Sequence, residues 1–165
     1  MESLNINVMN NEDNSVDKID KSQINISPAS EVYCENLMEF GKRLPSFYSN
    51  IDFLKKDLQD SMKCFYIAIY NNMPVGFVSF FKVFDEVHLA YIYVEVGFRN
   101  IGLGSRLFKH AVENFSLSGK EMWLEVESTN TLACAFYTKL GFRIIYKRKN
   151  YYGEHKDAWI MKREA

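Results

Sequence analysis

The spacing of apolar residues predicts a series of strands in the first half of the chain. Residues 23–26 alternate polar and apolar side chains, which is typical of a short strand. Turn-forming sequences follow at Asn71-Asn72-Met73-Pro74 and at Asp85-Glu86. Because both connections are short, we expect an antiparallel meander around them. Its strands are the β-rich runs at residues 64–70, 75–81 and 88–94.

Helical spacing dominates the segments on either side of this meander. Ser27-Pro28 predicts a helix start, since proline is favoured in a first turn. The buried face of that helix would comprise Val32, Leu37, Phe40 and Leu44. Further helices are expected at residues 51–58, from the turn at 99–105 to about 115, and at 129–140, ended by Gly141 as a left-handed cap, with strands at 122–127, 142–146 and 158–161. This order predicts a mixed α/β fold with a β-α-β unit in its middle.

Composition narrows the class of protein to one folded domain of ordinary size. The chain has 165 residues, 47% of them apolar, and its 13 Phe and 10 Tyr exclude a mostly disordered protein. A formal net charge of −1 gives no general reason to expect nucleic acid or a membrane as a partner. Residues 1–20 are rich in asparagine and acidic side chains, which predicts a disordered tail. We therefore expect a single domain over residues 21–165.

The cysteines and the chain start bear on the compartment. Cys34, Cys64 and Cys134 form no C-x-x-C pair, which argues against a disulfide framework and a structural zinc site. The first residues lack the basic and apolar segments of a secretory signal, and no apolar run is long enough to span a membrane. We expect a cytoplasmic protein that uses no metal. No sequence pattern indicates its oligomeric state.

A glycine turn is the first candidate for ligand binding. Arg99-Asn100-Ile101-Gly102-Leu103-Gly104 lies between a predicted strand and a predicted helix, where unpaired N–H groups attract anions. The turn lacks the Gly-Lys-Ser/Thr of a P-loop, and Leu107 stands where a dinucleotide fingerprint needs a third small residue. Taken alone, the R-x-x-G-x-G pattern is equally compatible with a helix-start turn that binds no ligand.

Strand, turn and helix together resemble the acetyl-coenzyme-A-binding motif of the GNAT superfamily of N-acetyltransferases. The resemblance covers the order of elements from Gln23 to Met161. It implies the GNAT fold, a mostly antiparallel sheet of six or seven strands with about four helices, and acetyl-CoA as co-substrate. It also implies that the pantetheine arm pairs with the strand before the turn and that the pyrophosphate rests on the turn. The implied cofactor-binding residues are Ile92, Tyr93, Val94, Arg99, Asn100, Ile101, Gly102, Leu103, Gly104 and Ser105. Ile101 departs from the basic residue or Gln that is common in the family, although a cradle of backbone N–H groups does not depend on that side chain.

Four blocks in the second half resemble the RimI-type protein N-terminal acetyltransferases within that superfamily. They begin at Trp123-Leu-Glu-Val, Ala135-Phe-Tyr, Arg148-Lys-Asn-Tyr-Tyr and Asp157-Ala-Trp-Ile-Met. The resemblance implies that Glu125 is the general base, Tyr137 the general acid and Asn130 a cofactor contact. It places Tyr151 and Tyr152 in the acceptor groove. From the residues alone, Glu125 and Glu127 share a strand face and are equal candidates, and Tyr137 could equally be a core residue.

The chemistry of amine acetylation agrees with these assignments. A free α-amine has a pKa near 8 and lysine one near 10.4, so deprotonating the α-amine is easier by about 3 kcal/mol and a modest base such as Glu125 suffices. The resemblance therefore favours a protein N-terminus as acceptor.

Two alternatives remain. The first is a small amine, such as a polyamine, amino sugar or antibiotic, because residues 44–48 read Leu-Pro-Ser-Phe-Tyr where RimI-type proteins usually carry Pro-Trp. The second is a non-catalytic acetyl-CoA-binding module. Basic side chains outnumber acidic ones over residues 139–163, which suits a polyanionic cofactor or a solvated face.

Overall fold

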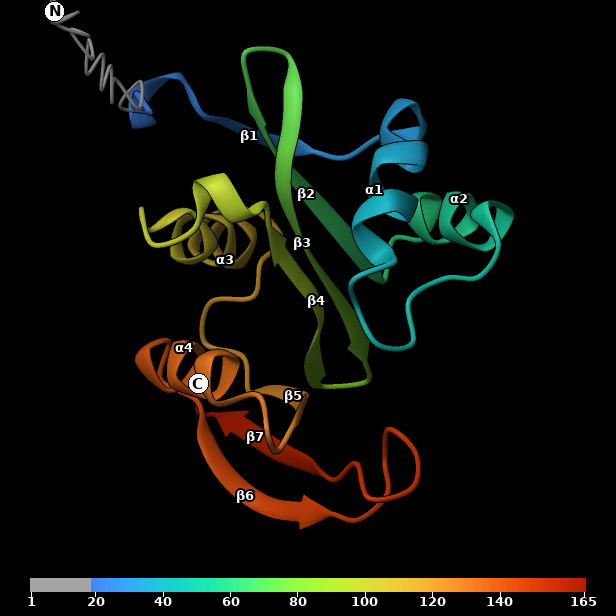
Figure 1. The fold of residues 1–165 in the computed structure, drawn as a ribbon, viewed down its shortest axis with the longest axis vertical. Coiled ribbons are helices and arrows are strands. Elements are labelled where there is room, and N and C mark those ends of the chain that lie inside the picture. The colour runs from blue at the N-terminus through green and yellow to red at the C-terminus, as the bar shows by residue number, and fades with distance from the viewer. Residues whose placement is uncertain (1–18) are drawn as a thin grey trace, which may run out of the picture.

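The computed structural model describes residues 19–165, which form a seven-stranded sheet with helices on both faces (Figure 1). The strands lie in the order β1-β2-β3-β4-β5-β7-β6, and every neighbouring pair is antiparallel except β4 and β5. Their bounds are Asn25–Pro28 (β1), Lys63–Tyr70 (β2), Met73–Val83 (β3), Glu86–Val94 (β4), Met122–Glu127 (β5), Arg143–Arg148 (β6) and Ala158–Arg163 (β7). The predicted fold class is therefore confirmed. Residues 1–18 of the predicted tail lie outside the described residues.

The four α-helices of the described residues are short. They are Cys34–Gly41 (α1), Ile51–Gln59 (α2), Leu103–Asn114 (α3) and Thr131–Lys139 (α4), and 3₁₀ turns span Lys21–Gln23, Glu31–Tyr33 and Val96–Phe98. Over residues 19–165, no helix combines the length and the apolar content that crossing a bilayer requires.

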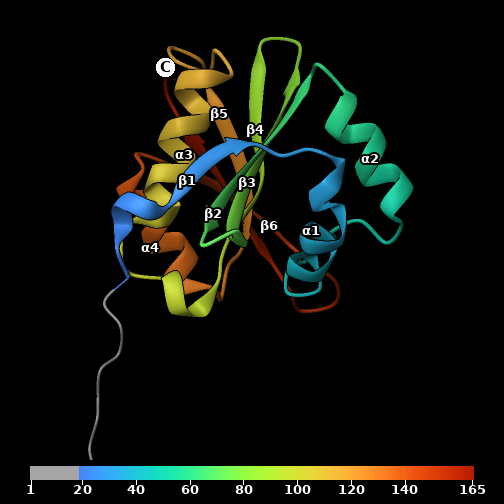
Figure 2. The same cartoon turned by 90° about the horizontal axis from the view of Figure 1, so that it is seen from above.

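Two apolar clusters hold these helices against the sheet. Figure 2 shows α3 and α4 on one side of the sheet and α1 and α2 on the other. On the first side, Leu103 and Leu107 of α3 join fully buried residues of β3, β5 and β7. On the second side, Leu37 and Phe40 of α1 and Leu54 of α2 pack against β2, β3 and β4. Burial of these side chains stabilises each helix, because helices this short are marginal in water on their own.

The β2–β3 hairpin turns on two asparagines. Asn71 and Asn72 have φ of 48° and 62°, the left-handed region that a two-residue type I′ turn requires and that asparagine tolerates. The predicted turn is therefore confirmed at its first two positions. Strand β3 resumes at Met73, and Pro74 pairs with Ile69 beside a bulge in the ladder.

The predicted start of the first helix is wrong. Pro28 is the last residue of β1 and lies opposite Tyr66 of β2. Proline is tolerated there because β1 is an edge strand, where a missing N–H leaves no ladder bond broken. The helix begins only at Cys34, so Val32 is 75% exposed and Leu44 lies beyond the helix end.

Candidate active site

Strands β4 and β5 are hydrogen-bonded only at one end. Their register contains Val87–Met122 and His88–Trp123 and stops there. Next to this point β4 carries a bulge, because Ser79 of β3 pairs with Tyr91 and Phe80 with Leu89, which leaves Ala90 unpaired. A bulge bends its strand. Beyond it, residues 89–94 of β4 and 124–127 of β5 face each other without pairing, and we call this stretch the β4–β5 opening.

Main-chain groups of β4 line one edge of this opening. The Glu95 N–H donates to the Val75 carbonyl on β3 at 2.9 Å. Because main-chain groups alternate sides along a strand, those of Tyr93 also face β3, and those of Ile92 and Val94 face the opening. The structure therefore brings two of the three predicted β4 residues to the opening. Tyr93 instead buries its ring against Phe40, with centroids 5.0 Å apart.

Arg99 is engaged at the end of β4. Its Nε donates to the Val94 carbonyl at 2.8 Å, and its guanidinium lies 5.7 Å from the centre of the Tyr93 ring. The side chain thus ties the glycine turn to the strand before it. What β4 still offers an extended ligand is the N–H of Val94 and both main-chain groups of Ile92.

The glycine turn presents a helix start with room in front of it. Gly102 is the N-cap of α3 with φ +86°, and a Cβ built on it meets nothing within 4 Å. The first helical bond runs from Arg106 N–H to the Gly102 carbonyl, at 3.1 Å, so the N–H groups of residues 103–105 have no intrahelical acceptor. The predicted turn residues Asn100, Ile101, Gly102, Leu103, Gly104 and Ser105 lie together here, with Leu103 buried and Ile101 packed on the core. This geometry suits an anion held by backbone N–H groups.

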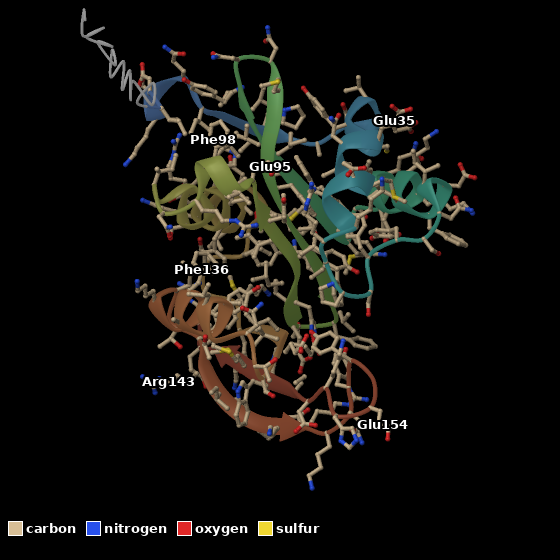
Figure 3. The ribbon with its side chains drawn as sticks, viewed as in Figure 1. Glu35, Glu95, Phe98, Phe136, Arg143 and Glu154 are labelled. Atoms are coloured by element: carbon tan, nitrogen blue, oxygen red, sulfur yellow. The ribbon has the colours of Figure 1, made fainter. Side chains whose placement is uncertain are left out.

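Gly104 marks a close approach of α3 to α4. A Cβ at Gly104 would lie 3.2 Å from two ring atoms of Phe136, which Figure 3 shows on the side of α4 that faces α3. Glycine is therefore favoured at Gly104 because a side chain there would crowd Phe136, whereas it is favoured at Gly102 because of the left-handed backbone conformation.

Asn130 begins the other helix beside the opening. It is the N-cap of α4, and its Oδ1 accepts from the Ala133 N–H at 3.1 Å. Such a cap fixes the orientation of the side-chain amide and leaves its NH₂ group for another partner. The predicted cofactor contact is thus a capping residue whose exposed side chain sits next to β5.

The two carboxylates of β5 differ in their hydrogen bonding. Glu125 and Glu127 share a strand face with Trp123. Glu127 accepts from the Thr129 hydroxyl at 2.9 Å. The Glu125 carboxylate makes no hydrogen bond or ion pair to any of residues 19–165. Of the two candidates that the sequence left equal, Glu125 is the one with its acceptor oxygens available.

Tyr137 lies on α4 against the larger apolar cluster. The centroid of its ring is 5.5 Å from that of the Phe136 ring and 6.1 Å from that of the Phe142 ring. Burial, with a smaller contribution from Cys134, raises the pKa of Tyr137 to about 12. A phenol in this environment stays protonated at neutral pH, which is the state that a general acid needs.

The β6–β7 connection brings Tyr151 and Tyr152 over β5. The Tyr152 hydroxyl donates to the Glu125 carbonyl at 3.1 Å. Tyr151 is 39% exposed, its ring stands edge-on to that of Tyr152, and the Arg148 guanidinium lies 4.7 Å from its centre. Both tyrosines therefore lie near the predicted base, but their hydroxyls have different surroundings.

The loop between α1 and α2 closes the same side of the sheet. Phe47 sits against Gly41, where a Cβ would be 1.9 Å from its ring, and its centroid is 4.8 Å from that of Tyr91. The Tyr91 hydroxyl donates to the Ser46 carbonyl at 2.7 Å. Sequence reasoning missed Tyr91, since a tyrosine in a strand of alternating apolar residues looks like any other core position.

Comparisons with known proteins identify the family of this chain. The profile of the acetyltransferase (GNAT) family matches residues 30–142. A ribosomal protein bS18-alanine N-acetyltransferase of Salmonella typhimurium is 40% identical over 83 residues, which are 48% of this chain and 56% of that protein. The chain thus spans little more than half the length of this relative.

Solved structures share the fold over most of the chain. The crystal structure of the ribosomal-protein-S18-alanine N-acetyltransferase from Escherichia coli has a TM-score of 0.73 at 26% identity and covers 86% of this chain and 93% of that one. A GNAT family acetyltransferase from Elizabethkingia anophelis, solved with acetyl-CoA bound, has a TM-score of 0.70 at 21% identity and covers 88% and 100%. The sequence profile, the RimI-type relatives and the shared fold lead to one conclusion: this chain belongs to the GNAT family of acetyltransferases.

Proposed function

We propose that the chain transfers an acetyl group from acetyl-CoA to the N-terminal α-amine of a protein, by direct attack in a ternary complex. One observation carries the proposal. The available carboxylate of Glu125 stands on β5, at the β4–β5 opening whose other edge offers the main-chain groups of Ile92 and Val94. The relatives named as ribosomal-protein-alanine acetyltransferases support a protein N-terminus as the acceptor.

The residues around the opening fit the co-substrate. Val94 and Ile92 would pair with the amides of the pantetheine arm as an added strand would. The N–H groups at the start of α3 would hold the pyrophosphate, and the open space at Gly102 admits it. When bound, acetyl-CoA supplies an activated thioester. Asn130, at the start of α4, would contact it through its NH₂ group.

Glu125 and Tyr137 would then handle the protons. Glu125 takes a proton from the acceptor ammonium, directly or through a water, and leaves the nitrogen lone pair free. The nitrogen forms a bond to the acetyl carbon while the carbon–sulfur bond breaks, and Tyr137 gives its proton to the departing sulfur. The second proton lost by the nitrogen returns through solvent to the phenolate, and Glu125 releases the first proton to solvent, so both side chains end the cycle unchanged. No covalent enzyme intermediate is needed.

The residues that flank Glu125 would bind the acceptor. Tyr151 and the loop carrying Phe47 lie on the same side of the sheet as the face of β5 that bears Glu125. We also propose a single acetyltransferase domain over residues 21–165, working in the cytoplasm. The free thiols of Cys34, Cys64 and Cys134 support a reducing compartment.

Thiol release from acetyl-CoA tests this function. The acceptors would be peptides with a free N-terminus, lysine peptides with a blocked N-terminus, polyamines and aminoglycosides. We expect turnover with the free N-terminus, and we expect Glu125→Gln to lower kcat by about 10²-fold, the usual contribution of a general base. Glu127→Gln, which changes the neighbouring carboxylate on the same face, is the matched control and should keep its rate. Acetyl-CoA binding without turnover of any acceptor would contradict the proposal, and equal effects of the two substitutions would remove Glu125 from its role.

A further inference from the structure

The β6–β7 connection is a closed loop fixed to the end of β5. The Asn150 N–H donates to Asp157 Oδ1 at 3.0 Å, and the Tyr152 N–H donates to the Lys156 carbonyl at 3.0 Å. The Asp157 carbonyl in turn accepts from the Ser128 N–H at 2.8 Å. These bonds set the position of Tyr152 relative to β5, so the contact made by its side chain has a defined geometry.

The Glu125 carbonyl faces the β4–β5 opening and has no neighbouring strand to bond. The Ser128 N–H points to β7, as its bond to Asp157 shows, and the Glu121 carbonyl points to β4, where it accepts from Val87 N–H at 3.2 Å. Alternation along β5 therefore turns the main-chain groups of Glu125 toward β4. The β4–β5 register ends at Trp123, two residues before Glu125.

The Tyr152 hydroxyl donates the hydrogen bond that β4 does not provide to the Glu125 carbonyl. It donates to this carbonyl at 3.1 Å across 27 positions of sequence. We propose that Tyr152 is a positioning residue that holds the base Glu125 in place by supplying the hydrogen bond that the divergence of β4 and β5 removes. This assignment rests on the proposed function, and it separates Tyr152 from Tyr151, with which the sequence grouped it in the acceptor groove.

The chemistry of Tyr152 suits this role. Burial, followed by the neighbouring Tyr151 phenol and Glu125 carboxylate, raises the pKa of Tyr152, so its hydroxyl remains a donor across the working pH range. A carbonyl left without a partner in a half-buried strand would be free to shift, and a displacement of 1 Å at a reacting group is enough to slow catalysis. Because the fixed carbonyl belongs to Glu125 itself, the hydrogen bond from Tyr152 also limits the movement of the Glu125 carboxylate.

Tyr152→Phe tests the inference because it removes the hydroxyl and keeps the ring. We expect kcat to fall about tenfold, the effect of one net hydrogen bond, with KM for acetyl-CoA and for the acceptor peptide unchanged. We also expect faster hydrogen exchange at the Val126 amide, which shares a peptide group with the Glu125 carbonyl. Tyr33→Phe is the control, since no hydrogen bond of the Tyr33 hydroxyl is found among residues 19–165 and the residue precedes α1.

Each outcome decides one question. A raised KM for the peptide with kcat unchanged would make Tyr152 a direct acceptor contact and overturn the inference. Unchanged exchange at Val126 would overturn it as well, and that readout needs no turnover. A wild-type protein that acetylates no acceptor would contradict the proposed function, while the exchange measurement would still judge the contact of Tyr152.

Discussion

Gly102→Ala separates the conformational role of the glycine turn from its role in binding. Gly102 has φ +86° and a Cβ there would meet nothing within 4 Å, so the substitution causes strain but no clash. The left-handed conformation costs a residue with a Cβ about 1–2 kcal/mol. For a chain of this size, where 1 kcal/mol shifts Tm by about 2–4 °C, that loss lowers Tm by about 2–8 °C.

The binding effect should exceed the stability effect. The added methyl group occupies the space in front of the α3 N–H groups where the proposed function places the pyrophosphate. We expect Kd for coenzyme A, measured by titration calorimetry, to rise at least about tenfold, which corresponds to about 1.4 kcal/mol.

Gly119→Ala is a matched control for this experiment. Gly119 has φ +70°, also has open space around it, and lies in the connection after the far end of α3. Its substitution should lower Tm by a similar amount and leave coenzyme A binding unchanged. Equal binding by the two variants would refute the assignment of the turn to the cofactor.

Three further substitutions test other parts of the account. Tyr137→Phe should lower kcat by about 10²-fold with coenzyme A affinity retained; because the pKa of Tyr137 is raised to about 12, the acid form persists below that pH, and a wild-type rate that falls between pH 7 and 9 through this group would contradict the role. Leu54→Ala should lower the free energy of unfolding by about 2–5 kcal/mol in a denaturant titration, since Leu54 is the fully buried residue of α2. A loss below about 1 kcal/mol would mean that the packing of Leu54 on the sheet does not hold α2 in place. Phe84→Gly should raise Tm, because Phe84 has φ 53° and is 96% exposed, so glycine relieves about 1 kcal/mol of strain without losing packing; a lower Tm would show that the ring has a contact that stabilises the hairpin.

The order of the elements could be predicted from the sequence because each leaves a local pattern. The strands of the meander follow the strand period, and the predicted stripe Leu103, Leu107, Ala111 and Phe115 follows the helix period. The first three stripe residues are buried, whereas Phe115 is the C-cap of α3 and is only partly buried. Gly141 ends α4 with φ +92°, as its cap position predicted. The sequence predicts Pro28 at a helix start, which is wrong, because a proline suits both a first helical turn and an edge strand and only the pairing of β1 with β2 decides between them.

The sequence predicts which residues belong to the candidate site, but it does not predict which contacts their side chains make. Two carboxylates on one strand face are equivalent in sequence, and they differ in the structure because Thr129 turns back onto Glu127. The contact of Tyr152 with Glu125 joins residues that are distant in the chain, so no local spacing signals it. The motif predicts Arg99 at the cofactor turn, but it does not predict the hydrogen bond from its side chain to the Val94 carbonyl.

The position of the transferred acetyl group shows which amine the protein acetylates. A peptide that carries both a free N-terminal α-amine and an internal lysine would be incubated with the protein and acetyl-CoA, and the product mapped by tandem mass spectrometry. We expect a single acetyl group on the α-amine, because that amine loses its proton more easily and Glu125 acts as an unassisted base. An acetyl group on the lysine side chain, or on neither amine while a small amine is acetylated, would contradict it.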